Sequence, residues 1–162
     1  MHMMATTKGV LAAVFVATAA LVMAGVSQRD LVLFNHSPSI PTGFYVRQDA
    51  SPSRGAIVTV RARDVAPAMA RERGFDEPGD RFIKRVAAIS GDEVCANGRH
   101  IIINGTTAAE RHSTTSLTLG WNGCRILSDG EVLLLGETAD SFDGRYWGAT
   151  SIDLIEGVWR KL

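Results

Sequence analysis

Downstream of Leu31 the chain is a succession of short segments rich in β-branched and aromatic residues, separated by glycine, proline and Asn-Gly turns. Segments of this length and composition are typical of β-strands. We expect strands at residues 43–47, 56–61, 81–89, 93–96, 99–103, 131–135 and 153–160. Asn97-Gly98 is the strongest hairpin signal among them, and Asn104-Gly105 ends the strand that follows. The pattern predicts a mainly β fold, an antiparallel folded sheet or barrel.

Two stretches interrupt this strand pattern. Residues 65–73 are rich in alanine and arginine and predict two helical turns, which Gly74 ends. Residues 106–124 are rich in threonine, serine and glycine and are typical of an irregular loop. Neither stretch changes the expected fold class.

An uncharged apolar segment, residues 9–26, precedes the strands. As a helix it would span about 27 Å, close to the hydrocarbon core of about 30 Å. It is either an uncleaved membrane anchor or a signal peptide cut after residues 22–24. A buried helix of a soluble domain is the third alternative, but the segment lacks a polar face. With Lys8 before it, we expect residues 1–8 in the cytoplasm, 9–26 as anchor or signal segment, and 27–162 as an extracytoplasmic domain.

Composition excludes some classes of function. The chain has 17 basic and 17 acidic residues, so we expect no nucleic-acid partner, because phosphate binding requires excess positive charge. It has no histidine–carboxylate pair at metal-ligand spacing, and two cysteines cannot form a four-thiolate site, so we expect no metal and no cofactor. Export leads to an oxidising compartment, so Cys95 and Cys124 are candidates for a disulfide, with two unrelated buried thiols as the alternative.

Two residues are candidates for nucleophilic chemistry. Ser39 lies between Pro38 and Pro41, and proline restricts the backbone on both sides, although an ordinary turn has the same composition. Lys84 is the only lysine within the body of the chain and shares a strand face with apolar neighbours. Burial lowers the pKa of a lysine, and a neutral amine can accept the proton of a serine. The alternative is a lysine whose amine reaches the sheet edge.

A histidine-based triad is the other catalytic hypothesis. His36 lies three residues from Ser39, and Asp143 has the chemistry to orient a histidine. Asp143 is also two residues from Arg145, which indicates an ion pair that positions its neighbours, or a simple surface turn. The residues alone leave these alternatives open.

The order of three motifs resembles the type I signal peptidase family. They are Ser-x-Ser before proline, Phe-Ile-Lys-Arg-Val with Gly-Asp downstream, and Asp-Ser-x-Asp-x-Arg-Tyr-Trp-Gly, between Leu31 and about Ile155. The family uses a Ser–Lys dyad. The short length and the Ser-x-Pro-x-Gly-x-Tyr pattern at residues 39–45 are most similar to the TraF-type peptidases of conjugative transfer systems, which process a pilin precursor and in some systems join its ends. Residues 62–80 differ from the housekeeping enzymes.

The resemblance implies a role for each matched residue. Ser39 would be the nucleophile, Lys84 the general base, and the Ser37 hydroxyl with the Ser39 N–H the oxyanion hole. The remaining matches would support this pair: Ser141, which orients the lysine, and the ion pair of Asp143 and Arg145.

We therefore expect a serine endopeptidase anchored in the inner membrane, with its catalytic domain in the periplasm. Its expected partners are the lipid bilayer, a membrane-tethered pilin-like precursor and a conjugative secretion apparatus. The alternatives are a general type I signal peptidase that cleaves exported preproteins, a LexA-like self-cleaving module, and a non-enzymatic β-domain that scaffolds an envelope complex.

Overall fold

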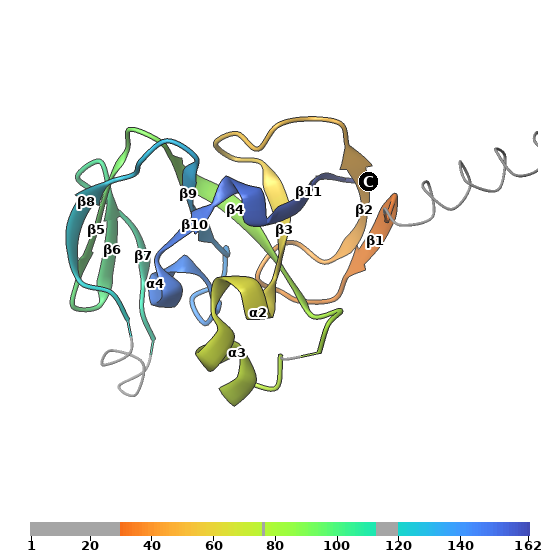
Figure 1. Cartoon of the computed structure of the whole chain (residues 1–162), viewed down its shortest axis with the longest axis horizontal. Helices are drawn as coiled ribbons and strands as arrows, with labels where there is room; N and C mark the ends of the chain where they lie inside the picture. Colours follow the sequence, from red (N-terminus) through yellow and green to blue (C-terminus); the bar gives the residue numbers. More distant parts are fainter. Residues whose placement is uncertain (1–29, 76, 113–119) are drawn as a thin grey trace, which may run out of the picture. The chain divides into compact units, whose positions relative to one another are not determined.

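A computed structural model describes residues 30–75, 77–112 and 120–162. The chain divides into two units, residues 1–31 and 32–162. The segment expected to be an anchor or signal peptide, 9–26, lies outside the described residues. Within the part of the chain that is described, no helix combines the length and apolar character needed to cross a membrane. The second unit is built from two antiparallel sheets and a few short helices (Figure 1), which confirms the predicted mainly β class.

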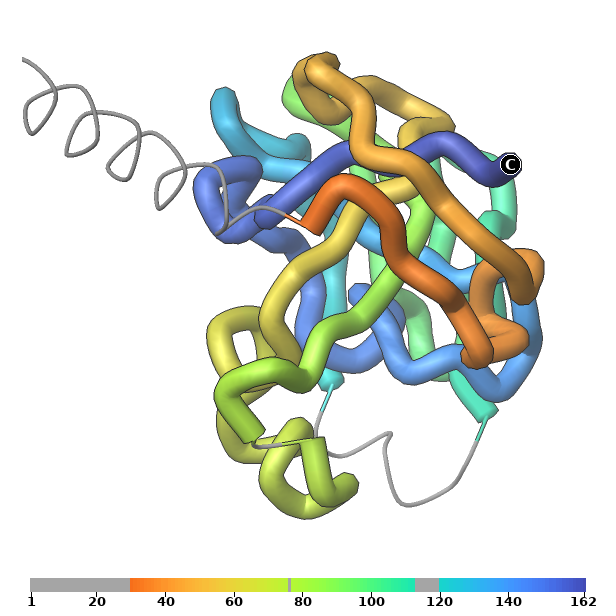
Figure 2. Tube along the Cα trace, turned by 90° about the vertical axis from the view of Figure 1, so that its right-hand side faces the viewer, coloured from red at the N-terminus to blue at the C-terminus, as the bar shows by residue number. Residues whose placement is uncertain are grey.

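The larger sheet has seven strands in the order β1-β2-β11-β3-β4-β9-β10. Their bounds are β1 Val32–Asn35, β2 Gly43–Gln48, β3 Ile57–Arg61, β4 Arg81–Ile89, β9 Glu131–Leu135, β10 Ala149–Ser151 and β11 Ile155–Lys161. β4 lies between β3 and β9, and its apolar side chains pack with theirs into one core cluster. Figure 2 shows β1 and β2 side by side, joined by the segment 36–42. This arrangement brings the candidate serine segment to the same sheet as the candidate lysine.

The smaller sheet has the order β7-β6-β5-β8. Its strands are β5 Glu93–Asn97, β6 His100–Ile103, β7 Thr106–Glu110 and β8 Gly123–Ile126. The first hairpin is confirmed, but its turn is one residue later than predicted: Asn97 pairs with His100, which leaves Gly98 and Arg99 in the loop. Gly98 has a φ of 57° while Arg99 keeps a negative φ, and a type II′ turn requires glycine at that first position.

The prediction of an irregular loop over residues 106–124 is wrong at both ends. Residues 106–110 form β7 and residues 123–126 form β8. Both strands are mostly exposed, and neither shows the alternation of apolar and polar residues that identifies a strand in a sequence. A two-residue turn in which Asn104 and Gly105 both have positive φ starts β7 directly after β6.

The helices are short. They are α2 Ala62–Val65, α3 Pro67–Glu72, α4 Gly144–Trp147 and the 3₁₀ turn Ile152–Leu154. The helical turns predicted over residues 65–73 are present, but they begin earlier and are divided at Ala66. Helix α4 was not predicted, because four residues show no helical periodicity.

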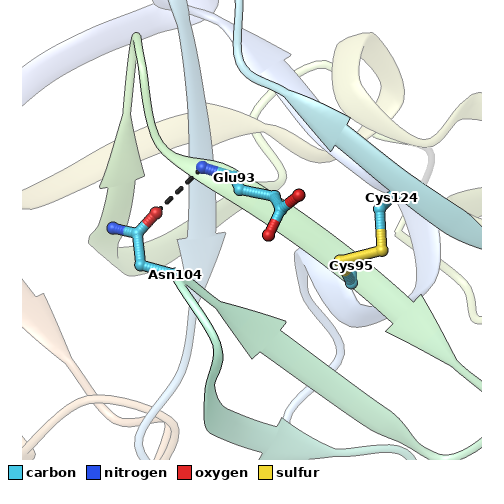
Figure 3. The surroundings of a disulfide bond; sticks show 4 residues. All are labelled: Glu93, Cys95, Asn104 and Cys124. Carbon is cyan, nitrogen blue, oxygen red and sulfur yellow. Dashed lines mark hydrogen bonds between the residues drawn. A yellow bond between two sulfur atoms is a disulfide. The ribbon is translucent and has the colours of Figure 1, made fainter.

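The predicted disulfide is present in the smaller sheet (Figure 3). Cys95 of β5 and Cys124 of β8 lie opposite one another in the strand pairing, with their Cα atoms 4.0 Å apart. The bond joins residues that are 29 positions apart in the sequence. It therefore links β8, at the edge of the smaller sheet, to the inner strand β5.

Candidate active site

Ser39 is held in a tightly bonded segment between β1 and β2. Asn35, the last residue of β1, donates from Nδ2 to the carbonyl oxygens of Ser37 (2.9 Å) and Ile40 (2.8 Å). Its Oδ1 accepts from the N–H of Ser37 at 3.0 Å. Ile40 is fully buried and anchors the segment in the core. Ser39 is 5% exposed as a result, and Asn35 is a positioning residue that sequence reasoning missed, although asparagine commonly makes such local bonds.

Lys84 comes from β4, where it pairs with Val58 of β3. Its Nζ lies 2.9 Å from the Oγ of Ser39. The lysine is 4% exposed, and Phe82, on the same strand face as predicted, has its ring centroid 5.7 Å from Nζ. Burial lowers the pKa of Lys84 to about 8; nearby Asp143 opposes this shift. An appreciable fraction of the amine is therefore neutral near physiological pH.

Ser37 contributes a second hydroxyl beside Ser39. The two Oγ atoms are 3.1 Å apart, and the N–H of Ser39 donates to the Oγ of Ser37 at 3.4 Å. A hydroxyl donor and a backbone N–H thus lie next to the candidate nucleophile. Such a pair is the usual composition of an oxyanion hole.

Asp143 and Arg145 act on Ser39 through the loop 136–139. Both side chains are almost completely buried, and the Nε of Arg145 lies 3.0 Å from the Oδ1 of Asp143. Arg145 donates to three carbonyl groups of the loop at 2.8 Å each: those of Gly136, Thr138 and Ala139. The N–H of Glu137 then donates to the carbonyl of Ser39 at 2.6 Å. The ion pair therefore holds the loop, and the loop holds the backbone of Ser39.

Ser141 is buried in the same region, with 4% exposure. Its Oγ has no hydrogen-bond partner among the described residues, so it makes no hydrogen bond to Lys84. A Cβ atom built on Gly136 would lie 2.1 Å from this oxygen, so the close approach requires glycine there. The orienting role implied for Ser141 remains a prediction.

The structure does not support a histidine triad around Ser39. The carboxylate of Asp143 accepts from the backbone N–H groups of Gly136 (2.6 Å) and Arg145 (3.0 Å), in addition to its ion pair. His36 is exposed, although it lines the cavity beside Ser39. The carboxylate that would orient a histidine is therefore already bonded to other groups.

A cavity of about 580 Å³ contains the Ser–Lys pair. Apolar side chains supply much of its wall: Leu33, Phe34, Phe75, Phe82, Ile83 and Phe142. Substrate-binding sites typically combine such an apolar wall with a few convergent polar groups. The geometry fits acyl transfer, with the hydroxyl of Ser39 beside an amine that can be deprotonated.

Comparison with known proteins identifies a family and several relatives. The family model described as "Signal peptidase, peptidase S26" matches residues 3–161. The chain is 33% identical over 166 residues to a plasmid transfer protein TraF of Escherichia coli, which covers 89% of each chain. It is 30% identical over 98 residues to a probable signal peptidase I-2 of Synechocystis sp., which covers 60% of this chain and 41% of that protein.

One solved structure is similar over nearly its whole length. It is a signal peptidase I from Enterococcus faecalis V583, with 19% identity and a TM-score of 0.42. The similarity covers 68% of this chain and 98% of that one.

Proposed function

The chain belongs to the signal peptidase family, peptidase S26, and from this premise we propose that it is a serine endopeptidase in which Ser39 is the nucleophile and Lys84 the general base. One observation carries the proposal: the Lys84 Nζ lies 2.9 Å from the Ser39 Oγ in a buried site. A serine hydroxyl is a weak nucleophile until a neighbouring base accepts its proton. Lys84 has both the position and the lowered pKa for this task.

The reaction proceeds in two halves. Lys84 accepts the proton of Ser39 as Oγ attacks the scissile carbonyl, and the N–H of Ser39 with the hydroxyl of Ser37 stabilises the oxyanion. The protonated lysine gives that proton to the leaving amine as the peptide C–N bond breaks, which leaves an ester on Ser39. Lys84 then activates a water molecule that hydrolyses the ester. A peptide amine in place of water would join two polypeptide ends instead.

The substrate we propose is a membrane-tethered, pilin-like precursor processed for plasmid transfer. The TraF relatives, which are named for plasmid transfer and align with about nine-tenths of the chain, support this context. The Cys95–Cys124 disulfide supports an oxidising compartment such as the periplasm. In this proposal residues 9–26 anchor the enzyme in the inner membrane, so that enzyme and substrate meet at high effective concentration.

The decisive test compares the purified protein with Ser39→Ala and Lys84→Met variants. The probe is an internally quenched peptide with an Ala-x-Ala sequence before the cleavage point, and mass spectrometry locates the cut. We expect cleavage by the unmodified protein and loss of at least about a thousandfold in kcat/KM for either variant. Ser53→Ala is the matched control, because Ser53 is exposed between β2 and β3. Cleavage by Ser39→Ala at the original rate would refute the proposal.

A cellular experiment separates the alternative functions. In a donor strain that carries Ser39→Ala, we expect one pilin-like precursor to accumulate and plasmid transfer to stop. Accumulation of many exported preproteins would indicate a general signal peptidase instead. Normal transfer by the Ser39→Ala strain would indicate a scaffold without enzymatic activity.

A further inference from the structure

Residues between α3 and β4 supply part of the wall of the cavity that contains the Ser–Lys pair: Phe75, Gly79 and Asp80 line it. Helix α3 ends in a bonded turn: the N–H of Phe75 donates to the carbonyl of Ala70 at 2.9 Å, and that of Gly74 to Arg71 at 3.1 Å. Gly74 has a φ of 73°, the left-handed conformation that commonly ends helices. Ala70 is fully buried. The backbone therefore holds Phe75 in a definite place at the cavity.

Phe75 begins a row of three aromatic rings. Its ring packs edge-to-face on Phe82, with centroids 5.3 Å apart, and Phe82 packs in the same way on Phe142 at 5.5 Å. The guanidinium of Arg73 lies 4.4 Å from the centroid of the Phe142 ring. All three rings line the cavity, yet Phe75 remains 41% exposed. An exposed aromatic ring within a concave wall is an open apolar surface that a ligand can cover.

This aromatic row adjoins the reactive groups. The ring of Phe82 contacts Phe75 and also lies 5.7 Å from the Nζ of Lys84. A polypeptide bound with its scissile carbonyl at Ser39 therefore has a side chain within reach of the aromatic row. Charged side chains of both signs line the same cavity: the carboxylates of Asp80 and Asp140, and the guanidinium of Arg81.

We propose that Phe75, Phe82 and Phe142 form an apolar subsite that binds a leucine- or phenylalanine-sized side chain of the substrate, at a position other than the small residues next to the cleaved bond. The identity of the occupant rests on the proposed function, because only a cleaved polypeptide has to occupy this cavity. Phe75 is a specificity-determining residue in this subsite. Burying such a side chain against the rings increases kcat/KM by about tenfold over alanine.

The test uses internally quenched Ala-x-Ala peptides in which one other position at a time is alanine, leucine or phenylalanine. We expect the unmodified protein to prefer leucine or phenylalanine by about tenfold at one position, mainly through KM. Phe75→Ala removes that preference, so that the leucine, phenylalanine and alanine peptides are cleaved at similar rates, whereas Phe75→Leu retains part of the preference. Ile126→Ala, an exposed apolar residue on β8 that lines neither this cavity nor its rim, is the control.

Three outcomes of the peptide assay would overturn the subsite. They are the absence of any such preference, its persistence in Phe75→Ala, and an equal loss of cleavage of every peptide, which would mean a structural role. Loss of binding to phosphatidylglycerol vesicles by Phe75→Ala, with peptide preference unchanged, would assign the rings to lipid and also overturn it.

A binding experiment distinguishes failure of the subsite from failure of the proposed function. The same peptides, labelled for fluorescence anisotropy, are titrated with Ser39→Ala and with the Ser39→Ala/Phe75→Ala double variant. A Phe75-dependent preference in Kd without cleavage by the unmodified protein would refute the chemistry and keep the subsite. Cleavage without a Phe75-dependent preference would refute the subsite and keep the chemistry.

Discussion

Lys84 combines a charged residue type with a buried position, and its pKa of about 8 follows mainly from that burial. Only the neutral amine can accept the proton of Ser39. We expect kcat/KM for an Ala-x-Ala peptide to rise with pH and to level off above about pH 8, as the neutral fraction reaches its maximum. Lys84→Arg is expected to be inactive at every pH, because a guanidinium keeps its proton. A flat profile between pH 6 and pH 9 would contradict the role of Lys84 as the base.

The same burial makes Lys84 costly for stability at neutral pH. The folded-state pKa of about 8 is below the unfolded value of 10.5, so the unfolded state binds more protons between these two pH values. Stability from this group therefore rises with pH across that window and is lowest below pH 8. We expect Lys84→Met to raise the free energy of unfolding at pH 7 by about 3 kcal/mol, and by less above pH 10.5. Chemical denaturation at the two pH values checks this, with exposed Lys161→Met as the unaffected control.

Single residues also show the limits of sequence reasoning. The burial of Lys84 on the face of Phe82 follows from strand alternation, which is local information. The contact with Ser39, 45 residues away in the sequence, requires the pairing of β2 with β11 and of β11 with β3. Residue patterns alone left the serine and lysine as separate candidates, and the family resemblance joined them.

At the scale of elements, hairpins were predictable where turn residues identified them. The β5–β6 hairpin follows from its Asn-Gly pair, although the register differs by one residue. β7 was not predicted, because its five residues are mainly exposed and show no apolar pattern. It pairs with β6 through backbone hydrogen bonds, which do not depend on the side chains. The conformation of residues 144–147 depends on the Asp143 cap and on packing against β9, neither of which gives a periodic pattern.

Arg111, after β7, connects three elements through a fully buried guanidinium. It donates to the carbonyl groups of Arg145 (2.6 Å), Trp121 (2.6 Å) and Gly98 (3.2 Å). We expect Arg111→Met to lower the free energy of unfolding by about 3 kcal/mol or more, because buried carbonyl groups lose their donor. Arg111→Lys should also be destabilised, since an ammonium lacks the geometry for three separated acceptors. Urea denaturation measures both effects.

The control for this prediction is Arg99→Met, because Arg99 is exposed in the loop of the neighbouring hairpin. Its midpoint should stay within the error of the unmodified protein. An unchanged midpoint for Arg111→Met would show that the guanidinium does not hold these elements together.

At the scale of the whole molecule, the larger sheet is assembled from strands that are distant in the sequence. β11, near the C-terminus, lies between β2 and β3, and Trp159 pairs with both Arg47 and Ile57. Local propensity carries no information about such partners, so the sequence predicted five of the seven strands of the larger sheet, all except β1 and β10, but not their order. The sequence predicted one folded sheet or barrel, whereas the structure has two sheets. The chain passes from the larger sheet to the smaller at the turn between β4 and β5.

Asp92 lies in that turn and bonds to both sides of it. Its carboxylate accepts from Arg54 (2.7 Å), from the N–H of Ile89 at the end of β4 (2.8 Å) and from Asn104 of the smaller sheet (2.8 Å). These hydrogen bonds lower the pKa of Asp92 to about 2, and the bond from Arg54 makes the largest contribution. The stability that the charged carboxylate contributes is present above the unfolded pKa of 3.8 and is lost as pH falls toward 2.

We therefore expect Asp92→Asn to lower the free energy of unfolding at pH 7 by about 1–2 kcal/mol, a value reduced by solvent because Arg54 is half exposed. The difference from the unmodified protein should shrink between pH 4 and pH 2, because the carboxylate becomes neutral there. Urea midpoints measured at several pH values test this, with exposed Asp153→Asn as the control. A difference that stays constant down to pH 2 would mean that the stabilisation by Asp92 does not depend on the charge of its carboxylate.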